Sequence, residues 1–341
     1  MRRNKILLII FIILIPILAH VAFKKKYNMS SISSEAKTAE FILKYGEVNT
    51  NGHIMSETAY YFAKQVNELS NGEIIIEIYP SGQLGDDTQC YRSLKMGSLD
   101  IYRGNSASLS SEINALISAM SLPYLFTNRN HFWNVCNSEL GDKILEDVQH
   151  SFPGIRALAF LDEGARNFFT TDKPITSLND MEGLEVRMQS SSIMIDTALS
   201  LGAIPAQSEY IELYYSLQSK TIDGAENPPI SYYYNKFYEV APYYVKDAHT
   251  YSPSVMLISE LTWNNLGNKY QELIMEAAKL AQEYNKSKLI IDEEEIYINL
   301  RKEGVNITEL TDMDEWRKAT KPLYDKYNQF SDIIEEIKKL D

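Results

Sequence analysis

The chain has 341 residues, of which 45% are hydrophobic and 23% charged; this is typical of a folded globular protein, and its length favours two lobes over one. Its formal net charge of -13 argues against a nucleic-acid-binding function, because that affinity depends on Lys and Arg placed against phosphates. The same acidic balance repels anions, so a site for an acidic solute would need a local cation.

Residues 1–26 hold six basic side chains, no acidic one, and an apolar run from Ile6 to Phe23. This pattern is typical of a secretory signal or of a single N-terminal membrane anchor, and both alternatives stay open. We therefore expect the rest of the chain to be extracytoplasmic, either periplasmic or anchored to the outer face of the cytoplasmic membrane. Residues 27–38 are polar and Ser-rich and are interpreted as a tether. Cys90 and Cys136 show no framework spacing, so a disulfide and two free thiols are both compatible with the sequence.

The folded part is predicted to begin with a strand, a helix and a second strand. Glu40–Tyr45 is predicted as a strand, and apolar residues from Met55 to Leu69 then recur at helical spacing. The run Ile74–Tyr79 is rich in β-branched residues and is followed by Pro80-Ser81-Gly82, which indicates a second strand and a turn. This order and these lengths predict a βαβ unit and an α/β fold.

The alternation of strands and helices continues along the chain. Further strands are predicted at 99–103, 156–161 and 184–188, and helices at 194–201 and 211–217. After residue 260 the pattern is almost wholly helical, with segments at 266–288, 289–302 and 314–340. Residues 269–301 contain neither Pro nor Gly, so one very long helix or two abutting helices are expected there.

Polar and charged side chains recur where the predicted strands end. In chain order they are Glu47, Asn49 and His53, then Arg103 and Asn105, then Glu163 and Arg166, then Arg187 and Ser190. Ligands of α/β sheets bind outside the carboxyl ends of the strands. The recurrence therefore predicts a binding cleft at this edge.

Arg187 is the most informative of these residues, because it ends a short alternating segment and is followed at once by polar residues. A guanidinium at a strand end can hold a carboxylate through two parallel charge-assisted hydrogen bonds. A surface ion pair with Glu182 or Glu185 is the simpler alternative. A second polar cluster, Thr221–Pro229, contains Asn227, which could instead make only a local turn. We interpret Arg187 and Asn227 as binding a small organic acid.

Several motifs occur in a characteristic order between about Phe41 and Asn265. They are Ile78–Gly85, Ser121–Phe126, Gly164–Arg166, Asp180–Arg187, Leu201–Pro205, Glu212–Gln218 and Asp223–Pro228. By these motifs the chain resembles the DctP-family solute-binding proteins of TRAP transporters, the tripartite ATP-independent periplasmic systems that import organic acids. Lys220 and Gln207 depart from the Gly and Pro that are usual in the family.

The resemblance implies an α/β, two-lobed periplasmic-binding-protein-like fold with a long helix spanning both lobes. It places 39–164 and about 252–290 in lobe I, and 165–251 and about 291–341 in lobe II. It also implies that Arg187 clamps the ligand carboxylate, with Asn227 assisting, Arg166 as a second cleft arginine and Tyr210 as an aromatic against the ligand.

Within the family the chain looks closest to the hexuronate-binding type, partly through Arg103. Sugar hydroxyls would then meet side chains of the first lobe, namely Glu47, Asn49, His53 and Asn105. Binders of sialic acid, C4-dicarboxylates and keto acids share the pattern and stay open. The implied partners are the small and large membrane permease subunits, with this chain a monomer, and a ligand-sensing domain for a signalling partner is the alternative.

An enzymatic function is not expected. No pair among the five histidines has metal-ligand spacing, and the sequence lacks a nucleophile elbow and a phosphate-binding Gly-rich loop. Glu47, Glu163 and Glu212 could supply a glycosidase-like carboxylate pair. The arginines beside them favour binding an anion over raising a carboxyl pKa for acid catalysis. No catalytic residue, metal or cofactor is therefore predicted.

Overall fold

The computed structural model describes residues 39–112 and 115–341. The predicted signal or anchor (1–26) and the tether (27–38) lie outside the described residues. Within the described ranges, no helix combines the length and apolar character needed to span a membrane.

The first of two sheets has five strands in the order β2-β1-β3-β10-β4. They are β1 (Phe41–Gly46), β2 (Ile74–Tyr79), β3 (Ile101–Asn105), β4 (Ile155–Leu161) and β10 (Ser254–Ser259). Strand β1 is parallel to β2 and β3, whereas β10 runs antiparallel to both β3 and β4. Strands β1, β3 and β4 therefore point the same way, and their carboxyl ends meet at one edge of the sheet.

Helices packed on this sheet begin and end where the local sequence dictates. They are α3 (Ile54–Leu69), α4 (Asp87–Met96), α5 (Ser106–Glu112), η1 (Leu116–Ser121), α6 (Arg129–Cys136) and α7 (Glu139–Ser151). The imidazole of His53 accepts a hydrogen bond from the backbone of Met55 and caps α3. Asp86 and Gln89 form a capping box at the start of α4, which ends at Gly97 in the left-handed conformation.

The second sheet has six strands in the order β11-β9-β5-β8-β6-β7. They are β5 (Asn167–Thr170), β6 (Glu185–Arg187), β7 (Ile204–Ala206), β8 (Gly224–Asn227), β9 (Tyr243–Lys246) and β11 (Asn306–Glu309). The helical segments after β5 are η2 (Leu178–Met181), α8 (Ser192–Ser200), η3 (Tyr210–Glu212), α9 (Leu213–Gln218), α10 (Pro229–Tyr234) and η4 (Phe237–Glu239). Strand β8 lies between β5 and β6 and is parallel to β6, so the carboxyl ends of β6 and β8 are also neighbours.

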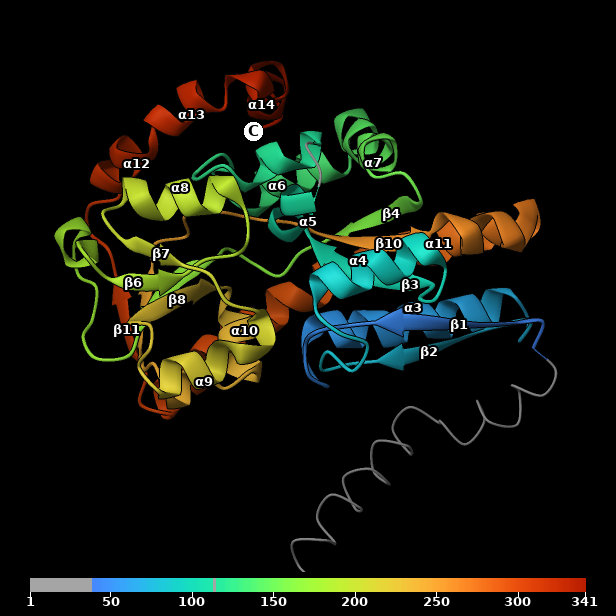
Figure 1. Cartoon of the computed structure of the whole chain (residues 1–341), viewed down its shortest axis with the longest axis horizontal. Helices are drawn as coiled ribbons and strands as arrows, with labels where there is room; N and C mark the ends of the chain where they lie inside the picture. The colour runs from blue at the N-terminus through green and yellow to red at the C-terminus, as the bar shows by residue number, and fades with distance from the viewer. Residues whose placement is uncertain (1–38, 113–114) are drawn as a thin grey trace, which may run out of the picture.

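A 43-residue helix, α11 (Glu260–Lys302), joins the two sheets. Its only non-helical residue is Gly267, so the part without Gly or Pro is one continuous helix. Buried side chains of α11 share one hydrophobic cluster with Tyr45 and Phe62 of the first sheet region and with Phe169 and Tyr232 of the second. Figure 1 shows the two sheets side by side with α11 passing between their regions. The α/β fold and the long helix in contact with both halves are as predicted.

The C-terminal segment runs from the second sheet back to the first. It contains α12 (Asp314–Thr320), α13 (Pro322–Lys326), η5 (Asn328–Phe330) and α14 (Ser331–Lys338) along the outer edge of the molecule (Figure 1). The sequence predicted one helical stretch here and placed 291–341 with lobe II. Strand β11 does pair with β9, but Leu323, Phe330 and Ile334 pack in the cluster that holds Phe132. We propose that each lobe is built on one sheet and that residues from 323 onward belong with the first lobe.

Candidate functional site

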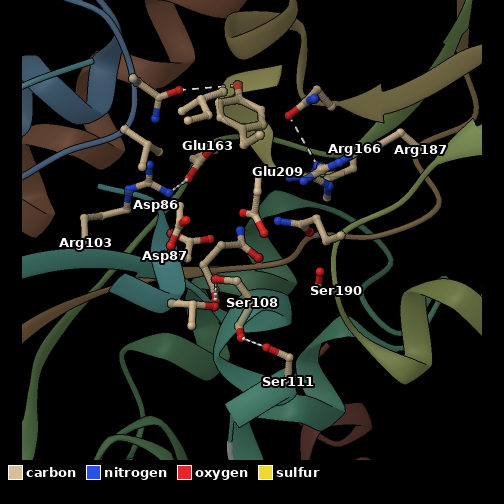
Figure 2. Close-up of a pocket in the computed structure, with 18 residues that line it drawn as sticks. Asp86, Asp87, Arg103, Ser108, Ser111, Glu163, Arg166, Arg187, Ser190 and Glu209 are labelled. Carbon is tan, nitrogen blue, oxygen red and sulfur yellow. Dashed lines mark hydrogen bonds and ion pairs between the residues drawn. The ribbon is translucent and has the colours of Figure 1, made fainter. Parts of the chain in front are cut away.

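A pocket lies where the carboxyl ends of the two sheets face each other (Figure 2). Its lining residues are Val48, Asn49, Asp86, Asp87, Thr88, Arg103, Asn105, Ser108, Ser111, Glu163, Arg166, Arg187, Gln189, Ser190, Glu209, Tyr210, Ile211 and Asn227. Together with the open solvent at its mouth, the space between the lining atoms measures about 770 Å³. Eight of the ten predicted site residues line it, namely Asn49, Arg103, Asn105, Arg166, Arg187, Ser190, Tyr210 and Asn227.

Arg187 is a buried cation without a carboxylate partner. It is the last residue of β6, held in register by Ala206 and Ala225 on the neighbouring strands, and only 6% of it is exposed. Its Nε donates to the carbonyl oxygen of Ser208 at 3.1 Å, and no carboxylate in the described part of the chain lies within ion-pair distance. Burial lowers the pKa of Arg187, yet a guanidinium stays protonated in proteins. The charge is therefore available to an anion in the pocket.

Asn227, at the end of β8, adds an unused donor beside this cation. The residue is 2% exposed, and its Oδ1 accepts a hydrogen bond from Nη2 of Arg166 at 3.3 Å. That contact directs the amide so that Nδ2 is the free end, and Nδ2 has no hydrogen-bond partner. A buried donor without a partner is costly, so Nδ2 is available to an acceptor in the pocket.

Arg166 also lines the pocket, but its charge is compensated within the protein. Its Nε and Nη2 donate to the two carboxylate oxygens of Glu226, the Nη2 contact measuring 3.0 Å. Nε2 of His249 lies 3.6 Å from the same carboxylate, and its Nδ1 lies 2.6 Å from Asp247. Burial alone would lower the pKa of His249, but Asp247 and Glu226 outweigh it and raise the pKa to about 9. Arg166 is therefore part of a buried charge chain.

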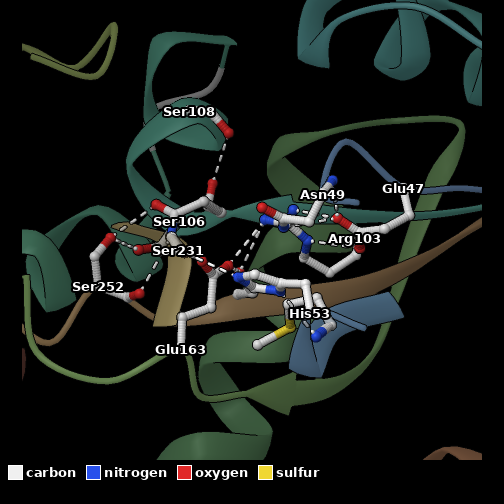
Figure 3. Close-up of polar contacts among 12 residues, drawn as sticks. Glu47, Asn49, His53, Arg103, Ser106, Ser108, Glu163, Ser231 and Ser252 are labelled. Atoms are coloured by element: carbon white, nitrogen blue, oxygen red, sulfur yellow. Dashed lines mark hydrogen bonds and ion pairs between the residues drawn. The ribbon is translucent and has the colours of Figure 1, made fainter. Parts of the chain in front are cut away.

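Arg103, on β3, is compensated in the same way by two carboxylates. Its Nη2 and Nε donate to the oxygens of Glu47 at 2.6 and 3.1 Å, and its Nη1 donates to Glu163 at 2.9 Å (Figure 3). Nη1 also contacts Oγ of Ser254 on the adjacent strand at 3.3 Å. These contacts fix the guanidinium against the first sheet. Arg103 can therefore donate a hydrogen bond to a ligand, but its positive charge is already compensated by Glu47 and Glu163.

Glu47 and His53 were expected to contact the ligand, but neither is among the residues that line the pocket. Figure 3 shows both side chains among polar contacts within the protein. Glu47 is occupied by Arg103 and by the backbone N–H of Asn49 at 2.9 Å. Nδ1 of His53 caps α3, and its Nε2 lies 3.0 Å from Oγ of Ser231 on α10. Burial lowers the pKa of His53 to about 4, so the ring is neutral at pH 7. Both side chains therefore have structural roles in the protein, and their contact with a ligand stays a prediction.

Asn49 and Tyr210 form a polar contact between the first lobe and the second. The hydroxyl of Tyr210 donates to Oδ1 of Asn49 at 3.5 Å and accepts from Nδ2 of Asn235 at 2.9 Å. The guanidinium carbon of Arg187 lies 5.8 Å from the centre of the Tyr210 ring. The aromatic side chain therefore borders the same cation that a ligand would contact.

The remaining two predicted residues, Asn105 and Ser190, differ in how many of their polar atoms are free to contact a ligand. The amide of Asn105 donates to the carbonyl of Ser252 at 3.2 Å and accepts from the backbone of Ala107 at 2.9 Å, so it mainly shapes the loop after β3. Ser190, after β6, is exposed at the pocket edge and can contact a ligand without first losing a protein partner.

Three acidic lining residues were not predicted: Asp86, Asp87 and Glu209. The first two stand at the start of α4, and Glu209 directly precedes η3. A search restricted to strand ends cannot find them. The capping pattern Asp86-x-x-Gln89 was a readable signal for the helix start, but nothing local indicated that this start borders the pocket.

Metal binding and disulfide formation find no support in the part of the chain that the structure describes. No group of three or more His, Cys, Asp or Glu side chains there could hold a metal ion. Cys90 and Cys136 are buried free thiols, which answers the question that the sequence left open. The geometry instead offers N–H donors and one uncompensated cation, an arrangement suited to binding a carboxylate.

Comparison with known proteins agrees with this chemistry. Residues 45–330 match the family model DctP, "Bacterial extracellular solute-binding protein, family 7". The sialic acid-binding periplasmic protein SiaP of Vibrio cholerae is 29% identical over 286 residues, covering 84% of this chain and 88% of SiaP. A TRAP periplasmic solute-binding protein from Bradyrhizobium sp. BTAi1, in complex with galacturonate, is 29% identical with a TM-score of 0.83, covering 87% of this chain and 99% of that one. A second, from Sulfurospirillum deleyianum with bound succinate, is 27% identical with a TM-score of 0.84, covering 89% and 100%.

Proposed function

Since the chain belongs to bacterial extracellular solute-binding protein family 7, the DctP family of TRAP solute-binding proteins, we propose that it captures a small organic acid by pairing the acid's carboxylate with Arg187. The bound acid is then delivered to a membrane permease. The protein performs no chemistry on its ligand.

The uncompensated charge of Arg187 carries this proposal. Arg103 and Arg166 each have internal carboxylates, whereas Arg187 has only the carbonyl of Ser208 as a close partner among the described residues. Moving a cation out of water is unfavourable unless a counter-charge replaces the lost hydration. A ligand carboxylate supplies that counter-charge and can accept two parallel hydrogen bonds from the terminal nitrogens.

Asn227 and Tyr210 complete the carboxylate end of the site. The free Nδ2 of Asn227 donates to a carboxylate oxygen or to a neighbouring hydroxyl, which removes the cost of an unpartnered buried donor. The Tyr210 ring covers the apolar side of a sugar or alkyl chain, and its hydroxyl stays tied to Asn49 and Asn235. Ser190 reaches the ligand from the edge.

A hexuronate such as glucuronate or galacturonate is the favoured ligand. The polar wall of the first lobe, with Asn49, Arg103, Asn105 and Ser108, suits a solute with several hydroxyl groups. A similar protein of solved structure holds galacturonate. Sialic acid, C4-dicarboxylates and keto acids are the alternatives, and relatives hold succinate or are named for sialic acid.

Delivery requires that the two lobes close over the ligand. A ligand favours the closed state only if it contacts both lobes there, and the pocket offers Arg187 and Asn227 from the second lobe against Asn49 and Arg103 from the first. Closure excludes water and strengthens the ion pair. We further propose that the chain acts as an extracytoplasmic monomer that docks on the small and large permease subunits. A role in presenting the ligand to a signalling partner is the alternative.

Replacing Arg187 tests the clamp. Arg187→Ala should weaken binding by roughly 2–5 kcal/mol, because the ligand carboxylate would be buried without its cation. Arg187→Lys should also bind poorly, since an ammonium lacks the planar fork. Isothermal titration calorimetry of the purified protein, without residues 1–26, measures both effects. Arg92→Ala is the matched control, because Arg92 is exposed on α4 and does not line the pocket.

The ligand for that titration comes from a thermal-shift screen of hexuronates, sialic acid, dicarboxylates and keto acids. A compound that binds only the folded state raises the melting temperature by an amount set by its concentration relative to Kd. Affinity unchanged in Arg187→Ala would refute the clamp. Conversion of any bound acid or glycoside to product would refute the assignment as a pure binding protein.

A further inference from the structure

The pocket is divided by charge. Asp86 and Asp87 project from the start of α4 in the first lobe, and Glu209 projects from the segment before η3 in the second. In Figure 2 Asp86 and Asp87 lie on one side of the pocket near Arg103, and Arg166 and Arg187 lie on the other, with Glu209 between the two sides. The charge of Arg103 is already compensated by Glu47 and Glu163. No Lys, Arg or His of residues 39–112 and 115–341 lies within ion-pair distance of the three carboxylates. This acidic wall therefore has no ion-pair partner there, although the charge of Arg187 acts on Glu209 from a longer distance; burial, the larger cause, raises the pKa of Glu209 and Arg187 lowers it.

The acidic wall also holds unused acceptors. Oδ1 of Asp86 accepts from the backbone of Gln89 at 2.8 Å, and Oδ1 of Asp87 accepts from the hydroxyl of Tyr102. Each of these aspartates keeps a second oxygen, and Glu209 keeps both of its oxygens, without a hydrogen bond to another described residue. Oε1 of Gln189, a buried atom that lines the same pocket, has no donor either. Such a wall can be satisfied by O–H or N–H groups of a ligand, and a carboxylate offers neither.

Independent observations on the opposite side fix the direction of the ligand. Arg187 is a buried cation without a carboxylate partner among the described residues, and Nδ2 of Asn227 is a buried donor without a hydrogen-bond partner there. Both residues line the pocket. An acid bound there directs the rest of its chain away from Arg187. Its far end can then reach the acidic wall, which lines the same pocket.

We infer that Asp86, Asp87 and Glu209 act as a filter for the far end of the ligand, accepting a hydroxyl-bearing or cationic end and rejecting a second carboxylate. This inference rests on the proposed function, because it takes the carboxylate at Arg187 as given. It narrows the substrate class to acids with a single carboxylate, such as uronic, aldonic or amino-substituted sugar acids. Dicarboxylates of the same length are excluded by repulsion from the three like charges.

Ligands that differ only at the far end test the filter. Galactonate ends in a hydroxymethyl group, galactarate has a carboxylate there, and 6-amino-6-deoxygalactonate has an ammonium group. Calorimetric titration with these three, with the corresponding gluconate series, and with galacturonate measures the effect. We expect galactarate to bind at least about tenfold more weakly than galactonate, and the amino compound to bind at least as tightly.

A variant of the acidic wall tests whether its carboxylates cause the difference in affinity between galactonate and galactarate. Glu209→Gln removes one charge from an exposed residue that has no hydrogen bond to lose among the described residues, so folding should be unaffected. It should reduce the galactonate-to-galactarate affinity ratio about tenfold, or to near one. Glu212→Gln is the matched control, because Glu212 lies three residues on, is exposed and does not line the pocket. Its ratio should equal that of the unaltered protein.

The outcomes separate the filter from the clamp. Galactarate binding within threefold of galactonate, or an unchanged ratio in Glu209→Gln, would overturn the filter and leave the clamp standing. Failure of every sugar acid to bind, together with tight binding of succinate that survives in Arg187→Ala, would overturn the proposed function itself. Absence of binding by any tested acid would overturn both.

Discussion

Arg103, Arg166 and Arg187 line one pocket and differ in the carboxylates that surround them. Glu47 and Glu163 hold the first, and Glu226 holds the second. Burying each of these ion pairs costs desolvation free energy. Removing one partner destabilises the protein more, because the other charge is then buried without a counter-charge. These pairs give the pocket a fixed shape, and they leave Arg187 as the residue whose charge the ligand itself completes.

His249 links the site to the pH dependence of stability. The pKa of His249 is about 9 in the folded protein, against an ordinary value of 6.5, so the folded protein binds the extra proton more tightly. The resulting stabilisation is fully present below pH 6.5 and is lost as the pH rises through 9. Its source is the contact with Asp247 and Glu226, which also supports Arg166.

Replacing His249 should therefore change stability most at low pH. We expect the difference in unfolding free energy between the unaltered protein and His249→Gln to be largest near pH 6 and to shrink toward pH 9. Urea unfolding at a series of pH values measures this difference. His150→Gln is the control, because His150 is exposed at the end of α7. A difference that is constant, or that grows with pH, would contradict the charge chain.

At the level of single residues, the sequence predicted which residues lie at the site but not which ion pairs they form. The strand-end rule brought Arg187, Arg103 and Asn105 to one pocket, because β3 and β6 end where the two sheets face each other. Arg166 reaches the same pocket from the start of β5, which runs antiparallel to β8. The rule could not foresee which carboxylates would compensate which arginine, since Arg166 and Glu226 are brought together only by the antiparallel pairing of β5 with β8. Pairing across strands is set by tertiary register, which a single sequence does not specify.

At the level of elements, long periodic segments were predictable; among the short strands β6 was predicted, whereas β7 and β8 were not. The helices α3 and α11 and the strands β1, β2 and β4 appear close to their predicted bounds. Strand β8 is Gly-Ala-Glu-Asn, which has no strand-like alternation and begins with the Gly of a turn-forming Asp223-Gly224 pair. It forms a strand because both neighbours, β5 and β6, supply hydrogen bonds and all four residues are buried. Tertiary context here outweighs local preference.

The contact between β3 and α4 shapes the first-lobe wall of the site. Gly104 on β3 leaves room for Tyr91 of α4, whose hydroxyl lies 2.8 Å from Oγ of the pocket residue Ser108. A Cβ atom at Gly104 would lie 2.5 Å from that hydroxyl and 2.9 Å from the ring. Tyr91 is fully buried and cannot swing away. Glycine is therefore required at this position by the packing of the two elements.

Substituting Gly104 should weaken both folding and the pocket wall. We expect Gly104→Ala to destabilise the protein by about 1–3 kcal/mol, a typical cost of overpacking a core. Thermal or chemical unfolding measures the loss. Gly46→Ala on β1 is the milder comparison, because its nearest contact would be 3.2 Å from a side-chain atom of Tyr102. Equal stabilities for Gly104→Ala and the unaltered protein would contradict the proposed tight packing.

At the level of the whole molecule, two sheets are joined by α11 and by the segments that lead from β4 to β5 and from β9 to β10. The last two run side by side, with a bridge between Arg166 and Thr250. The site therefore lies beside the connections on which the lobes would pivot. Ser231 of the second lobe contacts both His53 and Glu163, so the charge network reaches across this boundary.

The overall architecture was largely predictable, whereas the path of the C-terminal segment was not. The chain length and the family resemblance predicted two lobes, and the absence of Pro and Gly from residues 269–301 predicted one very long helix or two abutting helices. The apolar residues Ile333, Ile334 and Ile337 predict an amphipathic helix but not the surface that it covers. That surface proved to be the hydrophobic cluster of the first sheet.

The most direct test of the clamp is a crystal structure with the acid that gives the largest thermal shift. The account predicts carboxylate oxygens within about 3 Å of both terminal nitrogens of Arg187, with Nδ2 of Asn227 donating to the same group or its neighbour. The far end of the ligand should face Asp86, Asp87 and Glu209. A carboxylate bound at Arg103 or Arg166, with Arg187 contacting only protein and water, would contradict the account.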